Sequence, residues 1–161
     1  MLKKILLFFT GLVSIQIIAA QSIPNIKTTT LQGKTFETGI LNQPNNKIHV
    51  LCFWATWCMP CINELSTIND LAEEWAKELQ FDLYAISEDD SRTTKKVPAI
   101  ASGKGWTFSI LIDKNQEFKR FLNFSAIPFT LVVKNGKVIY RHNGYTEGDE
   151  TQLYEILKNN Q

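Results

Sequence analysis

The central part of the chain places one long amphipathic segment between two short apolar runs. Residues 48–54 and 81–87 are mostly apolar, as expected for strands buried on both faces. Between them, apolar side chains recur at helical spacing from Pro60 to Leu79, and Pro60 suits a first helical turn because its missing N–H is not needed there. A strand, a helix and a strand in this order predict a parallel βαβ unit.

The predicted helix has one continuous, mainly apolar face. With 100° between successive residues, this face contains Cys61, Glu64, Leu65, Ile68, Leu71, Ala72, Trp75, Ala76 and Leu79. Polar residues fill the other side. The helix is therefore expected to pack on a sheet with a cysteine and a glutamate turned inward.

Shorter elements are predicted on both sides of this unit. Turn residues within 26–45 separate strand-like pieces and predict an N-terminal hairpin. The polar-to-mixed segment 88–105 predicts a helix that Pro98 limits and Gly103 and Gly105 close. Further strands are expected at 108–112, 129–133 and 137–142, with a hairpin turn at Asn135-Gly136 and helices at 117–122 and 147–158. The chain is thus α/β, with a central mixed sheet flanked by helices.

The first twenty residues have the pattern of a targeting segment. Lys3 and Lys4 precede a nearly continuous apolar run from Ile5 to Ala20, which ends in small residues. This pattern predicts a secretory signal peptide over residues 1–20 and a periplasmic or otherwise extracytoplasmic mature domain over residues 21–161. The run is shorter than the roughly 20 residues of a comfortable membrane span, and an uncleaved membrane anchor is the alternative.

Composition supports a single globular domain and changes how the cysteines are interpreted. The chain has 161 residues, 44% of them hydrophobic, and a formal net charge of +1, so we expect a real core and no nucleic-acid partner. The protein is expected to be a monomer. In exported proteins cysteines usually form structural disulfides. Three cysteines, with one CxxC pair, make no such framework, and a disulfide closing so small a loop constrains the unfolded chain little. A chemical role is therefore favoured.

Cys58 lies where the strand ends and the helix begins. The unpaired N–H groups and the positive end of the helix dipole favour its thiolate, which is the attacking species in disulfide exchange. Cys61, one turn further, suits the second step, which resolves the mixed disulfide. The alternative is half of a zinc site, but the chain has no second CxxC, and His49 and His142 are distant in sequence. We expect no metal and no bound cofactor.

Two further residues have chemical potential. Glu64, one turn after Cys61 on the apolar face, would have its pKa raised by burial and could exchange a proton with a cysteine. The alternatives are a glutamate that reaches water, or a first-turn acid favoured by the helix dipole. Pro128 directly precedes a strand, and since only roughly 5% of X–Pro bonds are cis, the residues alone favour a trans bond. Cys52, in an apolar strand, is expected to be buried and inert.

The segment from Leu51 to Cys61 resembles the active-site segment of thioredoxin-like proteins. The following Ile62-Asn63-Glu64-Leu65 narrows the resemblance to the exported TlpA/ResA/DsbE branch, and residues 126–130 resemble that family's cis-proline loop. The resemblance spans most of residues 26–158. It implies a thioredoxin fold with an N-terminal hairpin extension and a central insertion within 88–105.

The resemblance also implies roles for individual residues. The catalytic set would be Cys58, Cys61 and Glu64, with Cys58 and Cys61 forming the redox-active disulfide. The substrate-binding residues would be Trp57, Met59, Pro60, Ile127 and Pro128. Pro128 would be cis and lie against the CxxC, with Ile127 offering backbone hydrogen bonds to a bound polypeptide. Cys52 occupies the position of the buried aspartate of thioredoxin itself, so Glu64 would transfer the proton alone.

The activity implied by the resemblance is reduction of disulfides in exported proteins, including apocytochrome c. Electrons would come from a membrane-embedded donor. An oxidase or isomerase, which uses the pair in the other direction, and a binding module without turnover are the alternatives.

Overall fold

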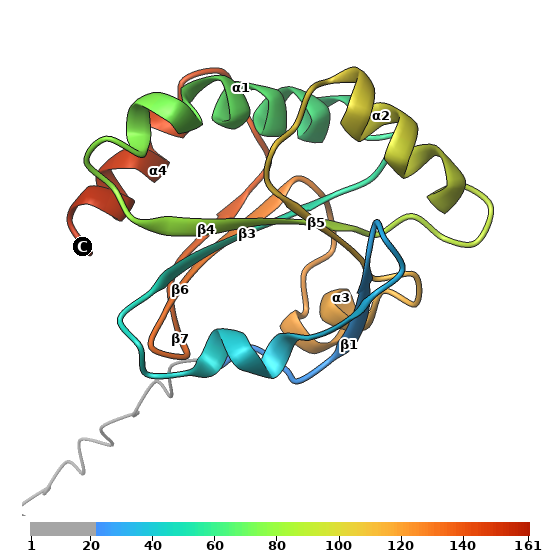
Figure 1. The fold of residues 1–161 in the computed structure, drawn as a ribbon, viewed down its shortest axis with the longest axis horizontal. Coiled ribbons are helices and arrows are strands. Elements are labelled where there is room, and N and C mark those ends of the chain that lie inside the picture. Colours follow the sequence, from blue (N-terminus) through green and yellow to red (C-terminus); the bar gives the residue numbers. More distant parts are fainter. Residues whose placement is uncertain (1–21) are drawn as a thin grey trace, which may run out of the picture.

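A seven-stranded sheet with helices on both faces makes up residues 22–161, the part of the chain that the computed structural model describes (Figure 1). The elements in chain order are β1 (Lys27–Thr30), β2 (Thr35–Glu37), η1 (Thr38–Asn42), β3 (Ile48–Trp54), α1 (Met59–Trp75), β4 (Phe81–Ser87), η2 (Thr94–Lys96), α2 (Val97–Gly103), β5 (Ser109–Ile112), α3 (Glu117–Leu122), β6 (Phe129–Lys134), β7 (Lys137–Asn143) and α4 (Asp149–Lys158). The predicted signal peptide lies outside the described residues. Within residues 22–161, none of the helices combines the length and apolar character that a membrane crossing requires.

The strand order is β2-β1-β5-β4-β3-β6-β7. The neighbours β3, β4 and β5 are parallel, whereas β6 pairs antiparallel with both β3 and β7. All seven residues of β3 are buried, as its unbroken apolar run predicts for a strand covered on both faces. The predicted parallel βαβ unit is confirmed, and so is the N-terminal hairpin, whose β1 extends the sheet beyond β5.

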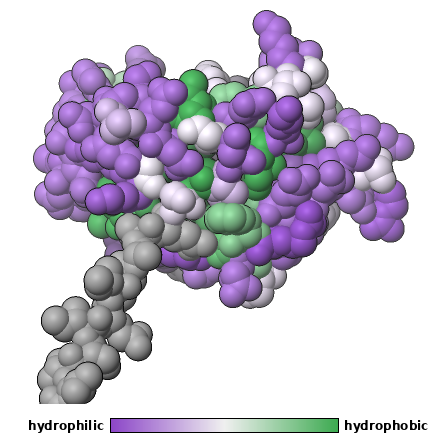
Figure 2. All heavy atoms as spheres, turned by 90° about the horizontal axis from the view of Figure 1, so that it is seen from below, coloured by the Kyte–Doolittle hydropathy of each residue, from purple (hydrophilic) through white to green (hydrophobic). Residues whose placement is uncertain are grey.

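The core has two halves, one on each face of the sheet. Helices α1, α2 and α4 cover one face and α3 and η1 the other (Figure 1). Alternate residues of β3 point into the two halves of the core. Val50 and Cys52 pack under α1, whereas Leu51 and Phe53 belong to the cluster around Phe118 of α3. The lower face is mostly hydrophilic, with hydrophobic groups in separate patches (Figure 2). The fold therefore buries its apolar material on both sides of the central strand.

Two predicted helix boundaries are wrong. Helix α1 ends at Trp75, whereas the periodicity predicted Leu79. The N–H groups of Glu78 and Leu79 both bond to the Trp75 carbonyl, and this turn keeps Leu79 buried while exposing Ala76. Pro98 does not limit a helix but stands in the first turn of α2, where its missing N–H has no helical partner to lose.

Candidate active site

Cys58 is the N-cap residue of α1. Its N–H donates to the Ala55 carbonyl at 3.0 Å, and its Sγ accepts from the Cys61 N–H at 3.4 Å. A disulfide joins Cys58 to Cys61, with their Cα atoms 5.3 Å apart. Sulfur at this position faces the positive end of the helix dipole, and no acidic residue stands in the first turn to oppose it. The predicted place of the CxxC pair is confirmed.

The two cysteines differ in their surroundings. Cys61 is completely enclosed, whereas Cys58 keeps 6% of its surface accessible. Trp57 and Met59, on either side of Cys58, are 64% and 63% exposed, and Pro60 is exposed as well. An incoming molecule therefore meets Cys58 and large apolar side chains first.

The loop before β6 contains Ile127 and Pro128, the other two predicted substrate-binding residues. The Ile127–Pro128 bond is cis, as the family resemblance implies, so the trans bond favoured by the residues alone is wrong. Ile127 is half-buried and packs against the core cluster that contains both Cys58 and Cys61. Pro128 is buried, and direct contact between its ring and the CxxC stays a prediction.

Glu64 is buried within the core, with 5% of its surface exposed. Thr130 donates a hydrogen bond from Oγ1 to Glu64 Oε1 at 2.7 Å, while Oε2 has no hydrogen-bond partner among the described residues. Burial raises the pKa of Glu64 to about 7; the Asp149 charge adds to the rise, and the Thr130 bond opposes it. The carboxyl of Glu64 is therefore not at the surface, and Glu64 lies beyond the first turn of α1. Both alternatives, a glutamate that reaches water and a first-turn acid favoured by the helix dipole, are wrong.

Cys52 contacts the same Thr130 hydroxyl as Glu64. Its Sγ is 3.5 Å from Thr130 Oγ1, and the residue is completely buried. Burial raises the pKa of this thiol well above its ordinary value, and the nearby Glu64 charge acts in the same direction. The predicted burial is confirmed, and a thiol held protonated is a poor nucleophile.

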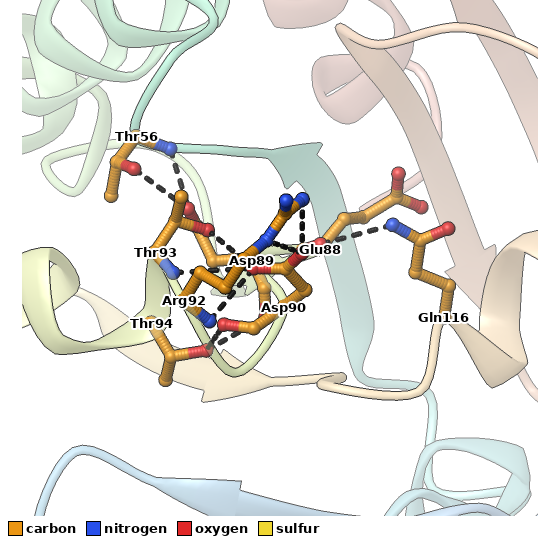
Figure 3. Close-up of polar contacts among 8 residues, drawn as sticks. All are labelled: Thr56, Glu88, Asp89, Asp90, Arg92, Thr93, Thr94 and Gln116. Carbon is orange, nitrogen blue, oxygen red and sulfur yellow. Dashed lines mark hydrogen bonds and ion pairs between the residues drawn. The ribbon is translucent and has the colours of Figure 1, made fainter.

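Asp89 is a site residue that the pattern of the sequence did not reveal. It is fully buried and accepts hydrogen bonds from the Thr56 N–H at 2.9 Å and the Thr56 hydroxyl at 2.6 Å (Figure 3). The Ser87 hydroxyl donates a third hydrogen bond to Asp89 at 2.9 Å. Thr56 belongs to the loop that carries Trp57 and Cys58. Asp89 therefore ties the cysteine loop to the end of β4. A signal was available, because Asp89 follows a buried parallel strand at the carboxyl edge of the sheet, where sites of α/β folds gather.

Glu88 and Asp90, the acidic residues on either side of Asp89, bind different partners. The side chain of Asp90 bonds to Arg92 and Thr93, and the Arg92 hydrogen bonds lower the pKa of Asp90 to about 2. The Glu88 carboxyl extends to the side opposite Thr56 (Figure 3) and lies 3.7 Å from Lys119. Burial raises the pKa of Glu88 to about 7, although Lys119 opposes the rise.

The two histidines stand apart. His49 is buried in β3 beside Asp82 at 3.3 Å, and His142 lies on β7 beside Asp149 at 3.1 Å. Within residues 22–161, no group of three or more His, Cys, Asp or Glu side chains is placed to hold a metal ion.

The sheet order, the disulfide at a helix N-terminus and the cis-proline before β6 together define a thioredoxin-fold redox protein. Comparison with known proteins makes the assignment more specific. Residues 19–141 match the AhpC/TSA family model, and the chain belongs to this family.

Three relatives illustrate the likeness. Thiol-disulfide oxidoreductase ResA of Bacillus thuringiensis (strain Al Hakam) is 31% identical over 152 residues, which cover 94% of this chain and 82% of that protein. The solution structure of an uncharacterized thioredoxin-like protein from Porphyromonas gingivalis is 37% identical, with a TM-score of 0.74 over 85% of this chain and 90% of that one. A secreted disulfide oxidoreductase of Mycobacterium tuberculosis, 21% identical with a TM-score of 0.65 over 81% of this chain and 93% of that one, shares the fold. The protein is a ResA-like thiol-disulfide oxidoreductase with the redox pair Cys58 and Cys61.

Proposed function

We propose that this protein reduces disulfides of exported proteins, with Cys58 as the attacking sulfur. The observation that carries the proposal is the contrast within the pair: Cys58 caps the helix between exposed Trp57 and Met59, and Cys61 is enclosed behind it. A disulfide of another protein can approach the first sulfur and not the second. This contrast gives the two cysteines successive roles.

The reaction has two exchange steps. The Cys58 thiolate attacks one sulfur of the substrate disulfide; that bond breaks, a mixed disulfide forms, and the first substrate thiolate leaves and takes a proton from solvent. Cys61 then attacks Cys58 Sγ, the Cys58–Cys61 bond forms, and the second substrate thiolate leaves. The substrate gains two electrons and the protein loses them. A dithiol donor must then reduce the Cys58–Cys61 disulfide, and we propose a membrane-embedded one.

Glu64 is proposed to take the proton that Cys61 must lose before it attacks. Glu64 follows Cys61 by three residues on the same helix, a spacing at which side chains are neighbours. With a pKa of about 7, the carboxyl can both accept and return a proton near neutral pH. The low exposure of Glu64 favours Cys61 as its proton donor.

The substrate is proposed to lie across the exposed surface around Cys58. Trp57, Met59 and Pro60 would contact it on one side, and Ile127 and Pro128 on the other. The signal-peptide pattern supports action outside the cytoplasm, and apocytochrome c before haem attachment is the substrate that the family resemblance favours.

An insulin-reduction assay tests the catalytic proposal. The wild type should precipitate reduced insulin chains in the presence of a dithiol, and Cys58→Ala should not. Equal activity in the two proteins would favour a binding module without turnover. Equilibration with glutathione or dithiothreitol buffers tests the direction, because a strongly oxidising potential would favour an oxidase or isomerase.

A trapping experiment tests the class of substrate. The variant Cys61→Ser should stall at the mixed disulfide and retain exported cysteine-containing proteins through Cys58. Mass spectrometry after release by a reductant identifies them. Recovery of the same proteins with the double variant Cys58→Ala/Cys61→Ser would show that they bind without disulfide exchange.

A further inference from the structure

A row of polar residues crosses three neighbouring strands beneath α1. Cys52 of β3 is paired with Thr130 of β6, and Thr130 is paired in turn with His142 of β7. Paired residues of adjacent strands point to the same face of a sheet, so the three side chains stand in line. In the next row of β6 and β3 this face is apolar, with Val132 opposite Val50. The polar row leads from the buried core towards one side of the sheet.

Glu64 meets this row at its centre and leaves one oxygen without a partner. Oε1 accepts the Thr130 hydrogen bond, while Oε2, on a residue 5% exposed, has no hydrogen-bond partner among residues 22–161. A small cavity of about 10 Å³ lies beside Glu64 and Thr130 and extends to His142 and Asp149. Such a volume has room for about one water molecule, and Glu64, Thr130, His142 and Asp149 offer that water polar partners within a lining that is otherwise largely apolar.

His142 connects this cavity with the surface. Its side chain is 27% exposed, and its Nε2 lies 3.1 Å from Asp149 Oδ2 at the start of α4. Asp149 Oδ2 also accepts the Thr146 N–H at 2.7 Å, so the carboxylate is itself held in place. A carboxylate on one ring nitrogen orients an imidazole and leaves the other nitrogen to accept a proton.

The other titratable groups around the cavity are a buried thiol, two phenols and two carboxylates that already accept hydrogen bonds. Cys52 of β3 is fully buried, and burial raises its pKa. Burial also raises the pKa of Tyr140 on β7 and of Tyr145, so both phenols stay protonated near neutral pH. Glu150 accepts hydrogen bonds from Tyr145 and the Gly148 N–H. Asp149 lies 3.1 Å from His142 Nε2. Among the residues that line the cavity, His142 is the one with a nitrogen base.

We propose that His142, oriented by Asp149, is the relay residue through which Glu64 exchanges its proton with solvent across one water in this cavity. The inference rests on the proposed role of Glu64. After Glu64 has taken the Cys61 proton, Glu64 gives a proton to the water, the water gives one to the imidazole, and the imidazole releases one to solvent. No electrons move in this step, and Glu64 is left ionised for the next turnover.

The test measures the regeneration of ionised Glu64 through the steady-state reduction of saturating oxidised insulin by the full-length protein, with excess dithiothreitol, in weak buffer from pH 6 to 9. His142→Gln is expected to slow this step by about tenfold, below the roughly 10²–10⁴-fold of direct acid–base catalysis, because slower routes to solvent remain. Added imidazole should restore the rate, since a small base can replace a missing relay but cannot repair a structural defect.

The chain provides a matched control in its other histidine–aspartate pair. Asp82→Asn removes the carboxylate that lies 3.3 Å from the His49 ring. His49 is near the start of β3, away from Cys52 and the polar row, so this variant should leave the rate unchanged. Asp149→Asn should produce a smaller loss than His142→Gln, because the imidazole remains but is less well oriented.

The outcomes separate this inference from the proposed function. If Glu64→Gln is slow but His142→Gln equals the wild type at every pH, the relay is wrong and the role of Glu64 stands. If His142→Gln is slow and imidazole does not restore it, His142 is structural and the relay is also wrong. If Glu64→Gln itself reacts at the wild-type rate, the proton-transfer role of Glu64 fails, and the relay fails with it.

Discussion

Replacement of Glu64 by glutamine should change how the stability of the protein depends on pH. Burial disfavours the carboxylate, so the folded pKa is about 7, against an ordinary value of 4.5. Between these two values the folded state binds more protons than the unfolded state. The stability contribution of Glu64 is therefore fully present below about pH 4.5 and is lost as the pH rises through about 7.

The size of this effect follows from the shift in pKa. The difference between 4.5 and about 7, at 1.36 kcal/mol for each pH unit, corresponds to about 3 kcal/mol. Glutamine does not titrate, so Glu64→Gln should lack this loss. Between pH 5 and pH 8, the free energy of unfolding of the variant should rise by about 2–3 kcal/mol relative to that of the wild type. Each kcal/mol corresponds to roughly 2–4 °C in melting temperature.

Urea unfolding of the oxidised proteins at pH 5, 6, 7 and 8 measures the effect. Glu88→Gln is the control, because Glu88 is also buried and its pKa is also about 7, although it lies beside Lys119. It should show a similar change in stability, yet leave disulfide exchange intact. Glu64→Gln should in addition slow exchange near neutral pH and flatten its pH dependence. Parallel stability curves for the wild type and Glu64→Gln from pH 5 to 8 would refute the raised pKa and with it the argument for proton transfer.

Three further predictions concern the surroundings of the cysteines. Asp89→Ala removes the acceptor of one buried and two partly buried hydrogen bonds. It should lower the free energy of unfolding by about 2–4 kcal/mol and slow disulfide exchange; an unchanged urea midpoint would contradict this. Thr130→Val removes the hydrogen bond that lowers the pKa of Glu64, so the midpoint of the pH–rate profile should move to higher pH, and a shift to lower pH would count against the assignment. In the reduced native protein, iodoacetamide should label Cys58 rapidly and Cys52 only after denaturation, as mass spectrometry would report; labelling of both at one rate would disprove the burial argument.

Several features of the site could be predicted because they depend on local periodicity. The apolar run of 48–54 and the amphipathic pattern that follows place Cys58 between a strand and a helix, whatever lies elsewhere in the fold. Helical spacing alone turns Cys61 and Glu64 inward. The sequence does not predict the end of α1 at Trp75, because Leu79 stands at helical spacing from Trp75 although the residues between them form a turn.

The remaining features depend on contacts between residues far apart in the chain. Thr130 reaches Glu64 across 66 residues and Cys52 across 78, and Asp89 reaches Thr56 across 33.

By itself the sequence determined the alternation of strands and helices, the place of the CxxC at a helix N-terminus and the inward direction of Glu64, because these follow from side-chain periods of 2 and 3.6 along one segment. Only the tertiary structure decided which polar groups meet. The contacts of Asp89 with Thr56 and the row that ends at His142 depend on strand order and register, and those are set by the packing of the whole sheet.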